Sequence, residues 1–486
     1  MRALFVNGIF GAERRDWMGM TAYLTATLLA LAPGHAAAAA RNIVVVDICS
    51  IRVDHMTPYN ASRDTTPRIE KLAKSGVVFE NAMAVGSWCL PNYATLFTGR
   101  YPESHGLYTN AVRGVPAFHE TLAEKLKDGG YETAAFSGGV YLLPDWGMDR
   151  GFDHYINSFS TAPGLRHPAP LAANLDDIGQ WLAERSTSTK PFFLYVAVDN
   201  LHSPFELKAP PADDPGYEGI ATDTRTMGVP FARAYSGEPD GYPPEYRELA
   251  GRFKSDPKNL RHYNARYDQA LRETDDEIGR FLDRLKALGV DQNTIIVLTG
   301  DHGETLGEHG LLGHTQGLYE TNLHVPLIVR LPGRKDLAGK RYRQLVERVD
   351  MMPTLLEWAG VDASSMRLPG RSLEPLLRDS SAPWRRYAFA GSHRNLPSTD
   401  SDALIDERVV RDERWKLHQS LYKDFYELYD LTSDPGETRD LARERPDEVA
   451  RLAFELQRWV ELNRPYAPAP PESFMPPHFE TGTPLR

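Results

Sequence analysis

The chain has few cysteines, no block of basic residues and no apolar run expected to span a membrane. Only Cys49 and Cys89 occur in 486 residues, too few for a scaffold held together by disulfides. The 66 acidic residues outnumber the 55 basic ones, which gives a net charge of −11. This balance argues against electrostatic binding of nucleic acid. We therefore expect no nucleic-acid partner, and each cysteine needs its own explanation.

The first 40 residues have the pattern of an export signal. Arg14 and Arg15 precede an apolar stretch at 21–31 that is too short to cross a bilayer, and residues 36–40 offer an A-x-A cleavage site. A retained N-terminal anchor is the alternative. We expect a signal peptide at 1–40, a periplasmic or secreted location, and no stable transmembrane span after processing.

From residue 42 onwards, apolar strands alternate with amphipathic helices. Strands are expected at 43–46, 77–79, 133–136, 192–198, 294–299 and 326–330, and helices at 67–75, 120–128, 265–288 and 352–359. This alternation predicts an α/β fold with a mainly parallel central sheet flanked by helices. Antiparallel-looking segments at 407–418 and 424–430 and a helix at 446–463 predict a smaller C-terminal α+β subdomain. The irregular, Pro- and Gly-rich residues 205–260 are typical of a functional loop or lid.

Polar residues follow three of the expected strands. They are Asp47-Ile48-Cys49-Ser50, the segment 199–202, and Asp301-His302-Gly303-Glu304. Ligands of such sheets bind beyond the carboxyl ends of the strands, and an adjacent Asp and His can offer a carboxylate and an imidazole to one cation. An isolated Asp-His-Gly can also be a capping Asp beside a solvent-exposed His. Two further histidines, His309 and His314, favour a metal or acid/base site.

These motifs together resemble the sulfatases of the alkaline phosphatase superfamily over nearly all of the chain after residue 40. Residues 297–304 resemble the second metal-binding motif of that family, 325–329 and 349–356 its downstream blocks, and 428–438 its C-terminal signature. Cys89-Leu90-Pro91 and residues 96–100 stand where the family carries its nucleophile. The resemblance implies an alkaline phosphatase-like fold with a catalytic domain at 41–384 and a C-terminal subdomain and tail at 385–486.

The resemblance also implies a metal-dependent hydrolase of sulfate, phosphate or phosphonate esters, acting on a small-molecule or glycan substrate. Cys89 matches the nucleophile, Asp301 and His302 match metal ligands, and His202 and His314 match groups that hold the anion and protonate the leaving group. One divalent metal ion is implied, calcium by resemblance. Two alternatives stay open: an impaired sulfatase-fold protein that binds an anion or a partner, and a transferase of phosphate-linked head groups.

The chain departs from the family pattern in both the nucleophile motif and the first metal-binding motif. Tyr93 replaces the arginine of the Cys-x-Pro-x-Arg maturation signature, so formylglycine at Cys89 is not expected. Tyr93 is either a phenol that touches the anion or a packing residue. Cys49 and Ser50 replace the one or two Asp of the first metal motif, which leaves Asp47 as the nearest carboxylate. Cys49 is either a buried hydrophobe or a thiolate ligand that favours zinc or manganese over calcium.

A second basic motif is also missing. The Lys-x-His pair that the family carries after the 133–136 strand has no match in the stretch 137–141. Because the resemblance brings Cys49 and Cys89 to one site and export exposes them to oxidant, we predict that they form a disulfide in air-oxidised protein. Their Cα atoms would then lie within about 7 Å.

Overall fold

The structure is a computed structural model that describes residues 41–463 except 60–61, 63, 109, 111–113, 160–167, 204, 206, 212–249, 252, 255–256, 315–316, 394–405 and 421–424. The expected signal peptide, most of the expected loop 205–260 and residues 464–486 of the expected C-terminal tail lie outside the described residues. The described residues belong to one compact unit, so the expected boundary between 384 and 385 stays a prediction.

The centre of the fold is an eight-stranded sheet in the order β10-β2-β9-β6-β1-β5-β3-β4. Strand β1 pairs in parallel with β5 and β6, β3 with β4 and β5, and β2 with β10, whereas β9 runs antiparallel to β2 and β6. The expected α/β fold with a mainly parallel sheet is therefore confirmed. The strands are β1 (Asn42–Ile48), β2 (Val77–Met83), β3 (Glu132–Ser137), β4 (His154–Asn157), β5 (Phe192–Val198), β6 (Thr294–Gly300), β9 (His324–Arg330) and β10 (Lys340–Glu347).

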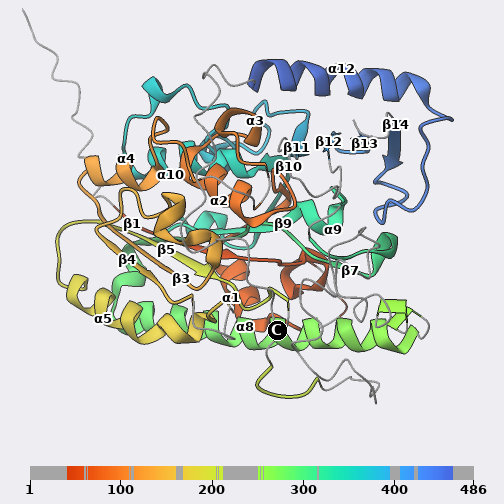
Figure 1. The fold of residues 1–486 in the computed structure, drawn as a ribbon. Helices are drawn as coiled ribbons and strands as arrows, with labels where there is room; N and C mark the ends of the chain where they lie inside the picture. Colours follow the sequence, from red (N-terminus) through yellow and green to blue (C-terminus); the bar gives the residue numbers. More distant parts are fainter. Residues whose placement is uncertain are drawn as a thin grey trace, which may run out of the picture. The chain divides into compact units, whose positions relative to one another are not determined.

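Both faces of the sheet are covered by helices, which explains why β1 is a continuous β-branched run. Ile43 and Val45 pack into one core with the helices α2 (Cys89–Thr98), α4 (Leu122–Asp128) and α10 (Met351–Ala359). Val44 and Val46 pack into a second core with α1 (Pro67–Ser75), α5 (Leu175–Arg185) and α8 (Pro257–Ala287) (Figure 1).

Helix α8 begins earlier than the expected residue 265. Its first turns carry Tyr263, which is buried and lies 5.2 Å from the ring of Phe205. Pro257 is a favourable first residue for the longer helix. A backbone N–H at the first helical position has no hydrogen-bond acceptor within the helix, so proline, which lacks this N–H, loses nothing there.

The C-terminal part contains the expected antiparallel sheet, in the order β11-β12-β13-β14. Its strands are β11 (Ala388–His393), β12 (Asp406–Arg411), β13 (Trp415–Ser420) and β14 (Phe425–Asp430), and α12 (Pro446–Asn463) packs against β12 and β13. Leu452, Leu456 and Trp459 of α12 form a separate core with Val410 and Leu417. Among the described residues, no helix combines the length and apolarity needed to cross a bilayer.

Candidate active site and metal centre

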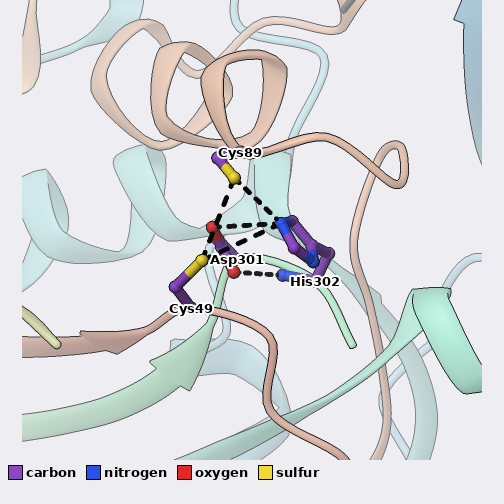
Figure 2. Close-up of side chains that lie close together, drawn as sticks. All are labelled: Cys49, Cys89, Asp301 and His302. Atoms are coloured by element: carbon purple, nitrogen blue, oxygen red, sulfur yellow. Dashed lines mark hydrogen bonds and ion pairs between the residues drawn. The ribbon is translucent and has the colours of Figure 1, made fainter. Parts of the chain in front are cut away.

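Four side chains from three distant parts of the chain converge at the carboxyl ends of β1 and β6. Ile48 pairs with Gly300 in the parallel register of these strands, so Cys49 and Asp301 emerge side by side. Cys89, the first residue of α2, approaches from the opposite side. Figure 2 shows both thiols and the Asp301 carboxylate pointing towards the ring of His302. One ligand atom from each of the four residues lies within 4.8 Å of the others. We call these four residues the cysteine cluster.

Backbone contacts fix the orientation of Asp301 and His302. Asp301 Oδ1 accepts hydrogen bonds from the backbone N–H groups of Ser50 (3.2 Å) and His302 (2.6 Å). His302 Nδ1 lies 2.7 Å from the carbonyl oxygen of Gly303. Because a carbonyl only accepts, Nδ1 carries the hydrogen and Nε2 is turned towards the thiols. Position 303 must be glycine, since a Cβ there would lie 2.0 Å from the carbonyl oxygen of Thr321.

Cys89 also belongs to an acid/base group with two further histidines. Its sulfur lies 3.2 Å from His302 Nε2 and 4.0 Å from His314 Nε2, and one ring nitrogen of His202 lies within 4.8 Å of the Cys89 and His314 atoms. On its other side, His314 Nδ1 lies 2.7 Å from the buried carboxylate of Glu304. Thiol, imidazole and carboxylate therefore follow one another in the order found in catalytic triads.

The electrostatics favour a thiolate at Cys89. The hydrogen bond from Cys49 lowers the pKa of Cys89 well below its usual value, and the nearby imidazoles of His302 and His314 add to this effect against burial. The pKa of Cys49 is raised well above its usual value by the same contact and by burial. A thiol beginning a helix also gains from the positive end of the helix dipole.

The pKa values of His202 and His314 are shifted in opposite directions. Burial lowers the pKa of His202, helped by the neighbouring charge of His314. Burial acts in the same direction on His314, but the Glu304 carboxylate and the Cys89 thiolate outweigh it and raise the pKa of His314 well above its usual range. Of these two imidazoles, His202 is therefore biased towards the neutral form and His314 towards the protonated form, which is an arrangement suited to base and acid roles.

The cysteine cluster fits one divalent cation. Asp301 Oδ2 is buried and accepts no hydrogen bond from any described residue. Burial raises the pKa of Asp301 to about 6, and the Cys89 thiolate contributes. A buried carboxylate oxygen that accepts no hydrogen bond and lies beside other acidic groups is unfavourable, and a bound cation would compensate its charge. The donor set of two sulfurs, one nitrogen and one carboxylate does not fit calcium, which takes six to eight oxygen ligands.

Asp47, expected as a metal ligand, lies elsewhere. Its carboxylate forms a two-point ion pair with Arg348 and accepts a hydrogen bond of 2.9 Å from the Tyr195 hydroxyl. Both Asp47 and Arg348 are fully buried. The expectation that Asp47 reaches the metal is therefore corrected: Asp47 neutralises a buried arginine beneath the site.

Tyr93 lies one helical turn after Cys89 on α2, so both residues face the same side. It is 1% exposed, and its hydroxyl has no hydrogen-bond partner among the described residues. Burial and the negative charge of Asp301 raise its pKa well above the usual value. The phenol is therefore a neutral donor without an acceptor.

Sequence reasoning missed two contributors to the site. The Asn110 side chain accepts from the Leu90 N–H (2.9 Å) and directs its amide to the Cys89 sulfur (3.7 Å). Asp199 accepts from the Gly138 N–H (3.3 Å), and burial, with Asp301, raises its pKa to about 8. Gly138 thus contributes a backbone N–H to the site at the end of β3. The polar residues after β5 were a signal for Asp199, whereas Asn110 follows no motif.

The two thiols are free, and their sulfurs lie 3.9 Å apart. The expected meeting of Cys49 and Cys89 in one pocket is observed. Their oxidation to a disulfide stays a prediction.

The fold and the site together define an ester hydrolase of the alkaline phosphatase superfamily. Comparison with protein families is more specific. The sequence model described as Sulfatase matches residues 41–361, and that described as N-sulphoglucosamine sulphohydrolase, C-terminal, matches residues 307–463. The chain belongs to the sulfatase family, and this membership supports the expected sulfuric ester hydrolase function.

The individual relatives have low sequence identity to this chain but match most of its length. The chain is 27% identical to arylsulfatase A of Bos taurus, with 91% of each chain covered. It is 25% identical to the N-acetylglucosamine-6-O-sulfatase of Bacteroides thetaiotaomicron, with 84% of this chain and 85% of the relative covered. Among solved structures, the phosphonate monoester hydrolase of Agrobacterium radiobacter is similar with a TM-score of 0.69 and 22% identity, covering 87% of this chain and 96% of the other. This last likeness shows the shared fold.

Proposed function

We propose that the protein hydrolyses a sulfate, phosphate or phosphonate ester with the unmodified thiolate of Cys89 as nucleophile. The carrying observation is the position of the Cys89 sulfur between His302 Nε2 (3.2 Å) and His314 Nε2 (4.0 Å), with Glu304 behind His314. Relatives that act on sulfated sugars support a small-molecule or glycan ester as the substrate class. With the export signal expected at 1–40, the proposed location of the reaction is outside the cytoplasm.

The proposed reaction has two steps. In the first, the Cys89 thiolate attacks the sulfur or phosphorus, the bond to the ester oxygen breaks, and protonated His314 gives its proton to the leaving oxygen. In the second, neutral His202 takes a proton from water, the hydroxide attacks the same centre, and the thiolate leaves with release of the inorganic acid or phosphonate. His202 then loses its proton and His314 regains one by exchange with solvent, which restores the starting state. Glu304 holds the His314 ring in place, and the Tyr93 hydroxyl donates to the anion. A divalent cation at the cysteine cluster would keep the Cys89 sulfur deprotonated and supply positive charge beside the substrate anion.

The test is turnover of 4-nitrophenyl sulfate, 4-nitrophenyl phosphate and 4-nitrophenyl phenylphosphonate by the purified protein, with acid quenching and mass analysis of the peptide that contains Cys89. We expect hydrolysis of at least one ester and a trapped adduct on an otherwise intact cysteine. Cys89→Ser should lower the rate by at least about a thousandfold. His314→Gln should also be impaired, whereas His309→Gln, an exposed histidine of the same loop, should retain activity.

The same experiment separates hydrolysis from mere binding. Tyr93 at the arginine position and the glycines at 138 and 139 remove cations that would hold the substrate. If no ester is turned over with any divalent ion while sulfate or phosphate raises the melting temperature, the protein is an anion-binding member of the family. Loss of sulfur from residue 89 in the mass spectrum would instead indicate formylglycine and contradict the thiolate mechanism.

A further inference from the structure

The cysteine cluster, Cys49, Cys89, Asp301 and His302, has the dimensions of a four-coordinate metal site. In zinc sites, metal–sulfur bonds are about 2.3 Å long and metal–nitrogen or metal–oxygen bonds about 2.0 to 2.1 Å. In a tetrahedral site with these bonds, the two sulfurs lie about 3.8 Å apart, a sulfur and a nitrogen about 3.5 Å apart, and a nitrogen and an oxygen about 3.3 Å apart. The corresponding separations are 3.9 Å between the sulfurs, 4.0 and 3.2 Å from the sulfurs to His302 Nε2, and 3.5 Å from this nitrogen to Asp301 Oδ2.

The donors are also oriented as ligands. His302 turns Nε2 to the thiols because Nδ1 donates to the Gly303 carbonyl, an outer contact typical of metal-binding histidines. Asp301 uses Oδ1 for two backbone N–H groups, which leaves the buried Oδ2 free to bind. Figure 2 shows the four side chains arranged around a common centre.

We propose that this site binds a thiophilic divalent ion of the zinc type in place of calcium, with Cys49 as the residue that sets the preference. Thiolates and imidazole select zinc and other late transition metals, whereas calcium needs more oxygen ligands than the cluster offers. Asp47, which would have supplied a second carboxylate, is held by Arg348.

This inference deepens the proposed function by naming the ion of the same site. A coordinated thiol is deprotonated. Binding would therefore keep Cys89 in the thiolate form that the proposed reaction uses. Metal binding can be measured without substrate, so failure of the hydrolase proposal and failure of the metal proposal give different results.

The experiment is a Co²⁺ titration of the purified protein, stripped of metal and reduced with a phosphine under nitrogen. Reduction converts any Cys49–Cys89 disulfide to thiols. We expect one equivalent of Co²⁺ to produce a thiolate-to-cobalt charge-transfer band in the near ultraviolet together with the intense visible bands of a tetrahedral ion. Zn²⁺ should displace Co²⁺ at one equivalent, whereas Ca²⁺ in large excess should not.

The variants assign the ligands. Cys49→Ser and Cys89→Ser should each lose about half of the charge-transfer intensity and weaken Co²⁺ binding by about a hundredfold or more. His309→Gln is the matched control and should match the wild type. Cys49→Asp tests the preference directly, because it should lower Zn²⁺ affinity and raise Ca²⁺ affinity. Circular dichroism of each variant verifies folding.

Two results would overturn the proposal. One is the absence of a charge-transfer band in reduced wild-type protein with Co²⁺ bound, which would place the ion away from the thiols. The other is displacement of Co²⁺ by Ca²⁺ at comparable concentration, which would show a site built from oxygen ligands. Absence of ester hydrolysis alongside the expected optical spectra would refute the proposed function and leave the metal site standing.

Discussion

Replacing Asp47 by Asn tests whether this carboxylate supports the fold or binds the metal. In the structure, the guanidinium of Arg348 pairs with both Asp47 oxygens and also donates to the carbonyl oxygens of Asn92 (2.6 Å) and Gly300 (2.7 Å). The side chains of Asp47 and Arg348 are 0% and 1% exposed. The pair thus connects β1, the start of α2 and the end of β6, which carry Cys49, Cys89 and Asp301.

The expected cost follows from burial. Asp47→Asn leaves the arginine charge without a counter-ion in the interior, and breaking a buried pair in this way costs about 3 to 5 kcal/mol. For a chain of 486 residues the entropy of unfolding is about 1 kcal/mol/K, so the melting temperature should fall by about 3 to 5 °C. Differential scanning calorimetry measures this change. The double variant Asp47→Leu with Arg348→Met removes both charges and should recover at least half of the loss.

The refuting result combines the same scan with the Co²⁺ titration. We expect Asp47→Asn to bind one equivalent of Co²⁺ with an unchanged charge-transfer band. A melting temperature within 1 °C of the wild type, together with Co²⁺ binding weakened tenfold or more, would show that Asp47 is a ligand and that its pairing with Arg348 is incidental.

Three further substitutions probe the neighbouring contacts. Glu304→Gln should lower kcat about a hundredfold or more, because the His314 ring loses its carboxylate partner; an unchanged kcat in steady-state kinetics contradicts the acid role. Tyr93→Phe removes a buried hydroxyl that has no partner among the described residues, so the melting temperature should hold or rise while kcat/KM falls; the reverse pattern would mean a packing role. Burial lowers the pKa of His105 to about 3, against about 6.5 when unfolded. The unfolded chain therefore binds the extra proton, and stability should fall as the pH drops from about 6.5 towards 3, by up to about 1.4 kcal/mol per pH unit. His105→Gln should flatten this slope in urea unfolding measured at several pH values.

The sheet followed from local patterns, whereas the meeting of the two cysteines followed from the resemblance to the sulfatases. Strands buried on both faces are continuous apolar runs, and adjacent parallel strands end at one edge, so Cys49 and Asp301 had to emerge together once β1 and β6 were neighbours. The position of Cys89 came from motif resemblance, because no periodicity places the start of α2 over that edge.

Contacts between distant residues were beyond sequence reasoning. Asp47 and Cys49 are two positions apart, a spacing that puts both side chains on one face of an extended strand, so the pattern could assign both to the metal. Arg348, which removes Asp47 from the site, is 301 positions away in the chain, and only the three-dimensional arrangement of β1 and the turn after β10 brings the two together. The contact of Asn110 with Cys89 could not be predicted either. Asn110 belongs to no strand or helix, so no periodic sequence pattern includes it.

The departures from the family pattern make more sense together than separately. Ser50 in place of a second carboxylate removes negative charge from the buried site, while Tyr93 in place of arginine and Gly138-Gly139 in the region of the Lys-x-His pair remove positive charge. Loss of the cations alone would leave buried carboxylates unpaired, and loss of the carboxylates alone would leave buried cations unpaired, each at a cost of several kcal/mol. A decaying site has no physical reason to lose both signs together while keeping Glu304 against His314 and an unpartnered Asp301 oxygen. The combined change is what a site would show if it exchanged oxygen ligands for thiolates and kept its chemistry.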